Sequence, residues 1–403
     1  MNNDPSPHKI SINALRLIEL AQGLIRIPSL LGQETAVARF LATYLQGLGL
    51  AVELQAVPFP AGQGSHQTIA RWRGSRPGPK VLLCGHLDTL EIFRPDQWTV
   101  PPYEARVVDG WLYGQGSLNM KAGLAAIVAA VEALRQAEVD LSGEIVIAGV
   151  MGETPGGFGI QHLLRQERDF EMAIVTEPTN LTVSTISVGT VQGRLRLWGD
   201  KLAFDPHPNP IYAMAKVLQA MGLAYDPQLP GGWLTFEPCP DLPGYPRINA
   251  HRIRSGQTYC DIYFDTRIVP GQNDDTVRLD LENLLARLKP ELPGITWELL
   301  IPTPIGTTNF PALPAVPPEH PLAQSLIRSH ALITGQPARV GAGDRLGLAS
   351  DAVHLRAAGI YALEYGPGKH PRWPMTDEHI LIEDVVTAAQ VLAETLLAMS
   401  QID

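Results

Sequence analysis

VLLCGHLDT, residues 81–89, is a short apolar run that ends in a turn carrying His86 and Asp88. An apolar run of this length, bounded by turn residues, is typical of a buried strand. His86 and Asp88 are two positions apart, so both side chains project the same way from an extended segment. In open α/β sheets, ligands bind at the carboxyl ends of the strands. The stretch therefore predicts a sheet strand that leads into a functional site.

Further apolar runs repeat this pattern along the chain. A long helical stretch at 121–136 separates the first run from the second, and helical spacing at 11–27 and 34–48 predicts two opening helices. Buried runs that alternate with helices are typical of parallel sheets. We therefore predict an α/β fold with a mostly parallel central sheet flanked by helices, whose strands include residues 81–84, 144–150, 172–176 and 360–365.

A middle segment has a different pattern of apolar and polar residues. Alternating stretches at 194–198 and 259–268 lie beside helical ones at 210–221 and 276–288, which predicts a smaller inserted α+β domain. The length of 403 residues also favours two domains. The predicted organisation is a catalytic domain formed by 1–188 and 303–403, interrupted by an insert at 189–302.

Composition excludes several classes of protein. The net charge is −10 and no Lys/Arg cluster occurs, so neither nucleic acid nor an anionic membrane is an expected partner. No run of about 18 apolar residues and no signal-peptide pattern is seen, which predicts a cytoplasmic location. The three cysteines, Cys84, Cys239 and Cys260, are far apart and predict no disulfide framework.

Three more polar residues follow predicted strands or precede the long helix. Asn119 lies in the loop WLYGQGSLNMK (111–121), Glu153 in the turn GETPGG (152–157), and Glu177 in TEPT (176–179). Three of the candidate residues have a structural alternative: Asn119 as a helix N-cap, Glu153 as a solvated loop residue, and His86 as a loop histidine beside an N-cap aspartate. The carboxylate of Glu177 needs a partner at a buried strand end, and a cation is one option.

Seven motifs follow one another along the chain: GHLDT (85–89), LYGQGSLNMKAGLAA (112–126), GETPGG (152–157), TEPT (176–179), DTRIVPG (265–271), SDAVHLRAAGI (350–360) and YGPG (365–368). Their order and spacing resemble the co-catalytic zinc aminoacylase/carboxypeptidase family, which includes acetylornithine deacetylase, succinyl-diaminopimelate desuccinylase and carboxypeptidase G-type enzymes. The resemblance implies a zinc exopeptidase-like fold whose insert is a lid and dimerisation domain, and hence a homodimer.

The resemblance also implies roles for individual residues. In the family two metals share a bridging Asp, and a Glu acts as general base on the attacking water. Carried over, the metal ligands are His86 and Glu177, with Asn119 standing where the bridging Asp belongs. Asp88 matches the carboxylate that orients the histidine, and Glu153 matches the general base. Asp88 and Glu153 are therefore the predicted catalytic residues.

Several positions depart from the family pattern. Thr154 stands where the second metal has a Glu, and Pro374 where it has a His; His370 lies four residues too early. At the position of the oxyanion-stabilising His the chain has Lys201 or Ala203, and His207 is out of register. Because the ligands of one metal are replaced and those of the other are kept, we predict one bound zinc ion or none.

Three functions are consistent with these residues. The first is a hydrolase of the amide bond of N-acyl amino acids or short peptides, with a single zinc and a substrate carboxylate bound by Arg252, Arg267 or Arg345. The second is an inactive or metal-free homologue that serves as a binding or partner protein. The third is a repurposed biosynthetic enzyme that uses His86, Asp88, Glu153 and Glu177 for acid/base chemistry in an acyl transfer or cyclisation.

Overall fold

The computed structural model describes residues 10–58, 64–200, 208–222, 232–302, 309–342, 348–369 and 375–400. The chain divides into two compact units, and each has its own hydrophobic core. The first unit comprises residues 1–185, 315–345 and 350–403, and the second comprises 186–314 and 346–349. The predicted insert, 189–302, lies inside the second unit. That unit extends further because Phe310 pairs with Thr190 beside its sheet.

The first unit is built on an eight-stranded sheet. Its centre is parallel, as predicted: the run β6-β3-β7-β14 contains only parallel pairs, and antiparallel pairs occur toward the edges. The strand order is β1 (Ala51–Val57), β2 (Ser65–Arg73), β6 (Ser142–Val150), β3 (Arg76–His86), β7 (Met172–Val175), β14 (Tyr361–Glu364), β8 (Val183–Ser184) and β13 (Val340–Gly341).

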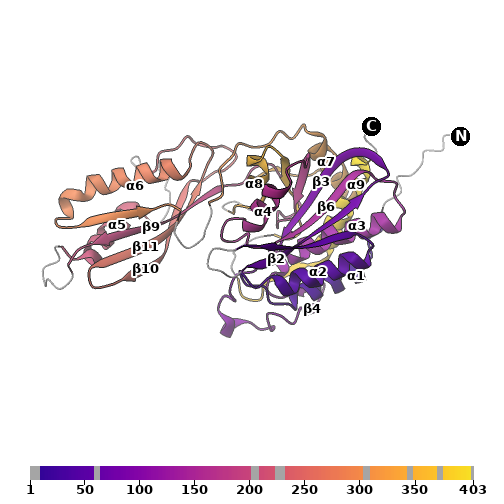
Figure 1. The fold of residues 1–403 in the computed structure, drawn as a ribbon, viewed down its shortest axis with the longest axis horizontal. Coiled ribbons are helices and arrows are strands. Elements are labelled where there is room, and N and C mark those ends of the chain that lie inside the picture. The colour runs from indigo at the N-terminus through magenta and orange to yellow at the C-terminus, as the bar shows by residue number, and fades with distance from the viewer. Residues whose placement is uncertain are drawn as a thin grey trace. The chain divides into compact units, whose positions relative to one another are not determined.

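Helices cover both faces of this sheet (Figure 1). Alternate residues of each central strand enter different cores: Leu83 packs with one helix layer, whereas Leu82 and Cys84 pack with the other. This two-sided burial explains why the strands are continuously apolar. One layer contains α1 (Ala14–Ile25), α2 (Thr35–Gly47), α3 (Ala122–Gln136), α7 (Pro321–Thr334) and α9 (Ile382–Met399), and the other contains α4 (Phe158–Gln166) and α8 (Ala352–Ala357).

Helix α3 lies at the centre of the larger helix layer. Among the described residues, Ser117–Gln136 is long and apolar enough to cross a membrane by length and composition alone, but its most apolar window is completely buried. Burial of this kind is typical of the core helix of a folded domain. A small separate sheet, β15-β5-β4, joins β15 (His379–Leu381) to β5 (Trp111–Tyr113) and β4 (Val107–Val108).

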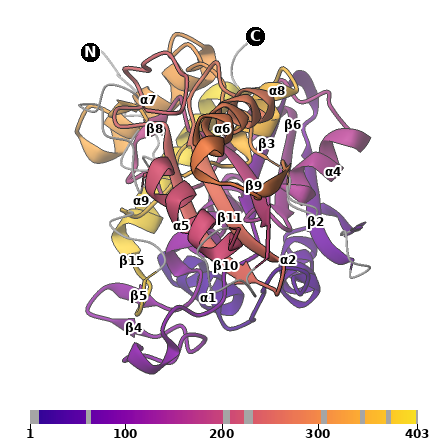
Figure 2. The same ribbon diagram turned by 90° about the vertical axis from the view of Figure 1, so that its left-hand side faces the viewer.

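The second unit is an antiparallel sheet with two helices on one face (Figure 2). Asn273 caps α6 through a reciprocal pair of hydrogen bonds with Thr276, and Asn209 caps α5. The predicted helices at 210–221 and 276–288 are confirmed, although the second begins two residues earlier. The order is β10 (Arg247–Ser255), β11 (Tyr259–Ile268), β9 (Gly189–Trp198) and β12 (Thr296–Leu300), covered by α5 (Pro210–Met221) and α6 (Asp274–Leu288).

Candidate active site

Three adjacent parallel strands bring the predicted site residues to one edge of the sheet. In the register of these strands His86 pairs with Val150, and Cys84 pairs with Val175. The chain continues from Val150 to Glu153 and from Val175 to Glu177 within a few residues. All three predicted side chains are buried there, His86 at 2%, Glu153 at 8% and Glu177 at 0% exposure. The sheet therefore places them at the carboxyl ends of its strands, where ligands bind in open α/β folds.

The imidazole of His86 is held on both sides. Its Nδ1 lies 2.9 Å from the main-chain carbonyl oxygen of Asp88, and its Nε2 lies 3.1 Å from Oδ1 of Asn119. The carboxylate of Asp88 is farther from Nδ1, at 3.6 Å. The nearer brace of the ring is thus the backbone of Asp88. A ring held through one nitrogen presents the other to a ligand, which is the usual arrangement of a metal-binding histidine.

The Asp88 carboxylate holds the turn that carries Glu153. Its Oδ1 accepts the backbone N–H of Glu153 at 2.9 Å, and its Oδ2 accepts the N–H of Thr154 at 3.0 Å. The Thr154 hydroxyl donates to the same Oδ2 at 2.8 Å. Thr154, which the family resemblance predicts to stand where a second metal would have a ligand, therefore donates its hydroxyl hydrogen to Asp88.

Asn119 lies in an irregular turn before α3 and does not cap that helix. The N-cap position of α3 is Lys121, and no side chain bonds to the helix there. Asn119 instead has an extended backbone, with φ −126° and ψ 94°, and its amide side chain faces His86. The alternative interpretation of Asn119 as a helix N-cap is wrong, because the helix begins three residues later.

Two buried acids complete the surroundings of the site. Glu378 accepts three backbone N–H groups of the turn that contains Asn119. Asp351, at the start of α8, is 1% exposed. Burial, with the nearby carboxylates of Glu153 and Glu177, raises the pKa of Asp351 well above its usual range. Asp351 lies in the motif SDAVHLRAAGI, but no role could be predicted for it, because nothing in the neighbouring sequence indicates which way its side chain points.

The electrostatic field at this edge favours a cation. Burial lowers the pKa of His86, but the carboxylates of Asp88, Glu153, Glu177 and Asp351 outweigh this effect and raise the pKa to about 9. A ligand atom of His86, one of Asp88 and one of Glu153 lie within 4.8 Å of one another. Imidazole nitrogen and oxygen donors in a buried cluster are the ligands that a divalent transition metal such as zinc accepts. The residues present therefore fit a metal ion.

Some of the predicted positions cannot be placed at this site. Lys201, Ala203, His207, Arg345, His370 and Pro374 lie outside the described residues. Arg252 and Arg267 belong to the second unit, where Arg267 pairs with Asp265 at 2.9 Å and the Arg252 guanidinium lies 5.8 Å from the ring centre of Tyr263. Their proposed contact with a substrate stays a prediction.

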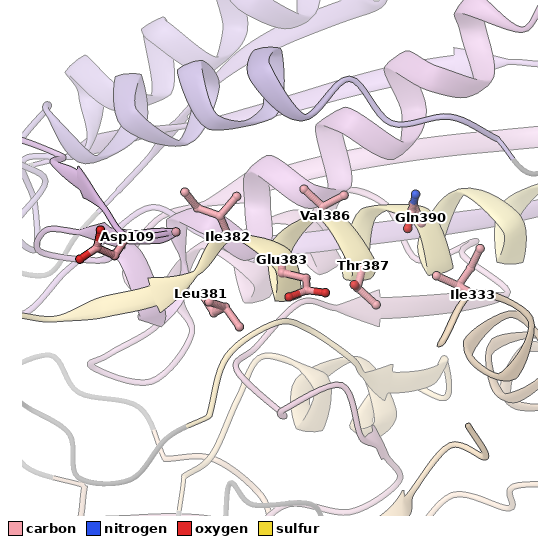
Figure 3. A pocket seen from close by; sticks show the side chains of 9 residues that line it. Asp109, Ile333, Leu381, Ile382, Glu383, Val386, Thr387 and Gln390 are labelled. Carbon is pink, nitrogen blue, oxygen red and sulfur yellow. The ribbon is translucent and has the colours of Figure 1, made fainter. Parts of the chain in front are cut away.

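A surface groove elsewhere on the first unit is distinct from this cluster. It has a volume of about 690 Å³ and runs along the first half of α9 (Figure 3). Its lining comes from α9 and the residues just before it, with Asp109, Gly110 and Ile333. None of His86, Asp88, Asn119, Glu153 and Glu177 lines it. The groove is therefore not part of the candidate active site.

Comparison with known proteins agrees with this geometry. Residues 82–398 match the Peptidase family M20/M25/M40. The chain belongs to the M20 peptidase family. This confirms the resemblance inferred from the seven motifs and places the chain among amidohydrolases and peptidases. Homologues in this family are metal-dependent. The fold class is confirmed as well, since solved structures of this kind superimpose over nearly the whole chain.

Two curated relatives of this M20 protein remove acyl groups, according to their names. The N-formyl-4-amino-5-aminomethyl-2-methylpyrimidine deformylase of Bacillus subtilis is 23% identical over 97% of this chain and 96% of its own length. The succinyl-diaminopimelate desuccinylase of Methylorubrum extorquens is 33% identical over 55% of this chain and 60% of its own. The solved di-peptidase Dug1p of Saccharomyces cerevisiae matches with a TM-score of 0.81 and 12% identity, covering 96% of both chains.

Proposed function

We propose that this M20 protein hydrolyses the amide bond of N-acyl amino acids or short peptides with a single zinc ion. The observation that carries the proposal is that His86 Nε2 and Asn119 Oδ1 lie 3.1 Å apart, in a site where the nearby carboxylates of Glu153 and Glu177 raise the pKa of His86. His86, Asn119 and Glu177 would hold the ion. A site with three protein ligands and an open position is typical of catalytic zinc.

One ion is favoured over two by the residues at the second position. A second ion needs ligands of its own, and the Thr154 hydroxyl is bonded to Asp88. Asn119 is neutral where a bridging carboxylate would help to offset the charge of two cations. Asp88 and Glu153 still provide negative charge near His86, as the raised pKa of that histidine indicates.

When bound, zinc lowers the pKa of a water and polarises a substrate carbonyl. The residues of the chain supply the proton transfers. Glu153 takes the proton of the attacking water and returns it to the leaving amine. Asp88 keeps Glu153 in place by accepting its backbone N–H. An arginine that binds the substrate carboxylate would orient the acyl amino acid.

The relatives support this class of substrate. The name of the deformylase describes removal of a formyl group from nitrogen, and the name of the desuccinylase describes removal of a succinyl group. Removal of an acyl group is also the proposed reaction. The acyl group and the amine of this protein's own substrate are the parts that a screen has to identify.

Zinc content tests the proposal. We expect one zinc per chain in the purified protein and hydrolysis of N-formyl, N-acetyl or N-succinyl amino acids that a chelator abolishes and zinc restores. His86→Ala is expected to remove both the metal and the activity. His330→Ala is a matched control. His330 is also a buried histidine, but it lies on α7 and its Nδ1 forms a hydrogen bond with the Tyr365 hydroxyl. Zinc content unchanged in the His86 variant would contradict the proposed ligand set.

A metal-free function is the second candidate, and Thr154 and Asn119 favour it because both replace carboxylates of the family pattern. Such a protein would bind an amino-acid-like ligand, or carry out acid/base chemistry with Glu153 and His86. It predicts a purified chain without zinc whose ligand binding, or turnover, is unaffected by chelator.

We further propose that the protein is a cytoplasmic homodimer that pairs through its inserted unit. The family resemblance and the composition support this proposal. Sedimentation equilibrium of the full chain tests the dimer, and a monomer at micromolar concentration would contradict it. Fractionation of cells that express the native chain tests the location.

A further inference from the structure

We infer that Glu378 is a positioning residue of the active site, which acts by fixing Asn119 against His86. The inference rests on the proposed function, because it assigns Asn119 to the metal site. Glu378 lies at the start of the last segment of the chain, beside β15, and its side chain is 1% exposed. No local signal in the sequence assigns it a role.

The evidence is the set of backbone groups that Glu378 accepts. Its Oε2 accepts the N–H of Gly116 at 2.9 Å, and its Oε1 accepts those of Leu118 at 2.9 Å and Asn119 at 3.0 Å. Its main-chain oxygen accepts the N–H of Gly114 at 2.8 Å. One residue thus binds four N–H groups within six consecutive residues.

The same turn has few other partners for its backbone. Gln115 donates to Pro102, while Ser117 and Lys121 donate to Gly114 and Gly116 inside the turn itself. Gly116 has a φ of +82° and packs so closely on Thr89 that an added Cβ would lie 2.7 Å from Thr89 Cγ2. The turn is therefore a tight, non-repetitive structure whose shape depends on the carboxylate of Glu378.

The consequence for the site follows from Asn119 itself. Its N–H is bound by Glu378 and its Oδ1 lies 3.1 Å from His86 Nε2. Glu378 therefore determines where the Asn119 backbone lies, and with it the distance between the two side chains that would share the metal. Groups that orient metal ligands in this way typically change metal affinity by about 10- to 100-fold when they are replaced.

Glu378→Gln is the informative substitution. Glutamine keeps the size of the side chain but replaces one accepting oxygen with an NH₂ group, which faces a backbone N–H that it cannot accept. Its neighbour provides a matched control. Asp377 also accepts backbone N–H groups, but from Thr99 and Val100, at 2.8 and 3.2 Å, in a loop that contains none of the site residues.

Zinc titration of the full chain by calorimetry measures the effect without substrate. We expect Glu378→Gln to weaken zinc binding by about 10- to 100-fold, and Asp377→Asn to leave it within about threefold. An unchanged affinity in Glu378→Gln, or an equal loss in Asp377→Asn, would overturn the inference. Wild-type protein that binds no zinc would instead reject the proposed function.

A double-mutant cycle with Asn119→Ala separates positioning from general destabilisation. If Glu378 acts through Asn119, its substitution costs little additional zinc affinity once Asn119 is alanine, since coupled residues are not additive. A purely structural role would weaken zinc binding by the same factor in both backgrounds. If Glu378→Gln does not fold, Glu378→Asp carries the same cycle, because it keeps both oxygens but withdraws them by one methylene.

A measurement without metal keeps the two proposals distinguishable. The side-chain ¹⁵N resonance of His86 Nε2 reports its contact with Asn119 in the metal-free chain. We expect Glu378→Gln and Asn119→Ala to shift this resonance in the same direction, and Asp377→Asn to leave it in place. A His86 resonance that is unchanged in Glu378→Gln would reject the positioning role, whatever the zinc content.

Discussion

The Asp88 carboxylate receives three donors from the turn that follows β6, two N–H groups and the Thr154 hydroxyl. Hydrogen bonds to a charged acceptor are stronger than those between neutral groups. Thr154 therefore belongs to the support of Glu153 rather than to a second metal position. The turn is thus ordered without a carboxylate at position 154.

Thr154→Val tests this support, because valine keeps the shape of threonine and removes the hydroxyl. We expect the free energy of unfolding to fall by about 1.5 to 3 kcal/mol, the usual contribution of a hydrogen bond to a charged group. Urea unfolding measures it. Thr43→Val is the control: the Thr43 hydroxyl donates to the Arg39 carbonyl on an exposed face of α2, and the effect of its loss is expected within about 0.5 kcal/mol.

His86 determines how zinc binding depends on pH. Its pKa, raised to about 9, means that the metal-free imidazole carries a proton at pH 7. A metal ligand must be deprotonated, so binding displaces that proton. We expect zinc uptake to release about one proton at pH 7 and zinc affinity to increase as pH rises toward 9. Calorimetry in buffers of different ionisation enthalpy measures the release, and zero release would contradict this prediction.

Glu34 is expected to contribute to the pH dependence of the free energy of unfolding. Burial, and secondarily Asp88, raises the pKa of this fully buried acid to about 7. Because the folded pKa exceeds the unfolded value of 4.5, the stabilisation is complete below pH 4.5 and is lost as pH rises through 7. The loss is about 3 kcal/mol at 1.36 kcal/mol per pKa unit.

Glu34→Gln is therefore expected to flatten the decrease in stability between pH 4.5 and 7. Guanidinium unfolding at several pH values measures this. Glu19→Gln, at an exposed position of α1, serves as the control, and its profile is expected to run parallel to that of the wild type. A profile of Glu34→Gln that also runs parallel would show that Glu34 does not titrate in this range.

At the scale of elements, helix α3 packs directly on the strand that leads to Glu177. A Cβ added to Gly123 would lie 2.2 Å from the carbonyl oxygen of Thr176, at the end of β7. This close approach requires glycine, although glycine is a poor helix former. The packing of one helix residue thus fixes where a site residue leaves the sheet.

Gly123→Ala is expected to destabilise the protein by about 1 to 3 kcal/mol, the usual cost of overpacking, despite the better helix propensity of alanine. It is also expected to weaken zinc binding through Glu177. Gly47→Ala in α2 is the matched control, since nothing lies within 4 Å of its added Cβ. Denaturation of both variants compares them, and a stabilised Gly123→Ala would contradict the packing argument.

Elements of the central sheet could be predicted because both of their faces are buried. The runs at 81–84, 144–150 and 172–176 are apolar throughout, and the structure has strands at all of them. Strands β8 and β13 are two residues long and leave no periodic pattern. The placement of His86, Glu153 and Glu177 at one edge of the sheet could be predicted from the strand ends, whereas Asn119 was assigned to the site by the family resemblance. Glu378 could not be predicted, because its partners lie about 260 residues away.

At the scale of the whole molecule, the two units have separate hydrophobic cores, and His86, Asp88, Asn119, Glu153 and Glu177 all belong to the first. Proteins with more than one domain commonly depart from two-state unfolding. A ligand stabilises only the state that binds it. The chain is therefore expected to show two unfolding transitions, and zinc is expected to stabilise only the transition of the first unit.

We expect differential scanning calorimetry of the full chain to show two transitions. Zinc at 100 times its dissociation constant is expected to stabilise one of them by about 2.7 kcal/mol. The transition of the second unit is expected to stay in place. A single transition that zinc shifts would mean that the units unfold together, and no shift would indicate that zinc does not bind the folded chain.

The four bonds from Glu378 to residues 114–119 also affect the order of events during synthesis. A ribosome makes the chain from the N-terminus, so the turn with Asn119 leaves the exit tunnel long before its partner exists. The turn can form these bonds only when most of the polypeptide has emerged. Incomplete translation products that stop before this glutamate would therefore carry His86, Glu153 and Glu177 without a finished binding site.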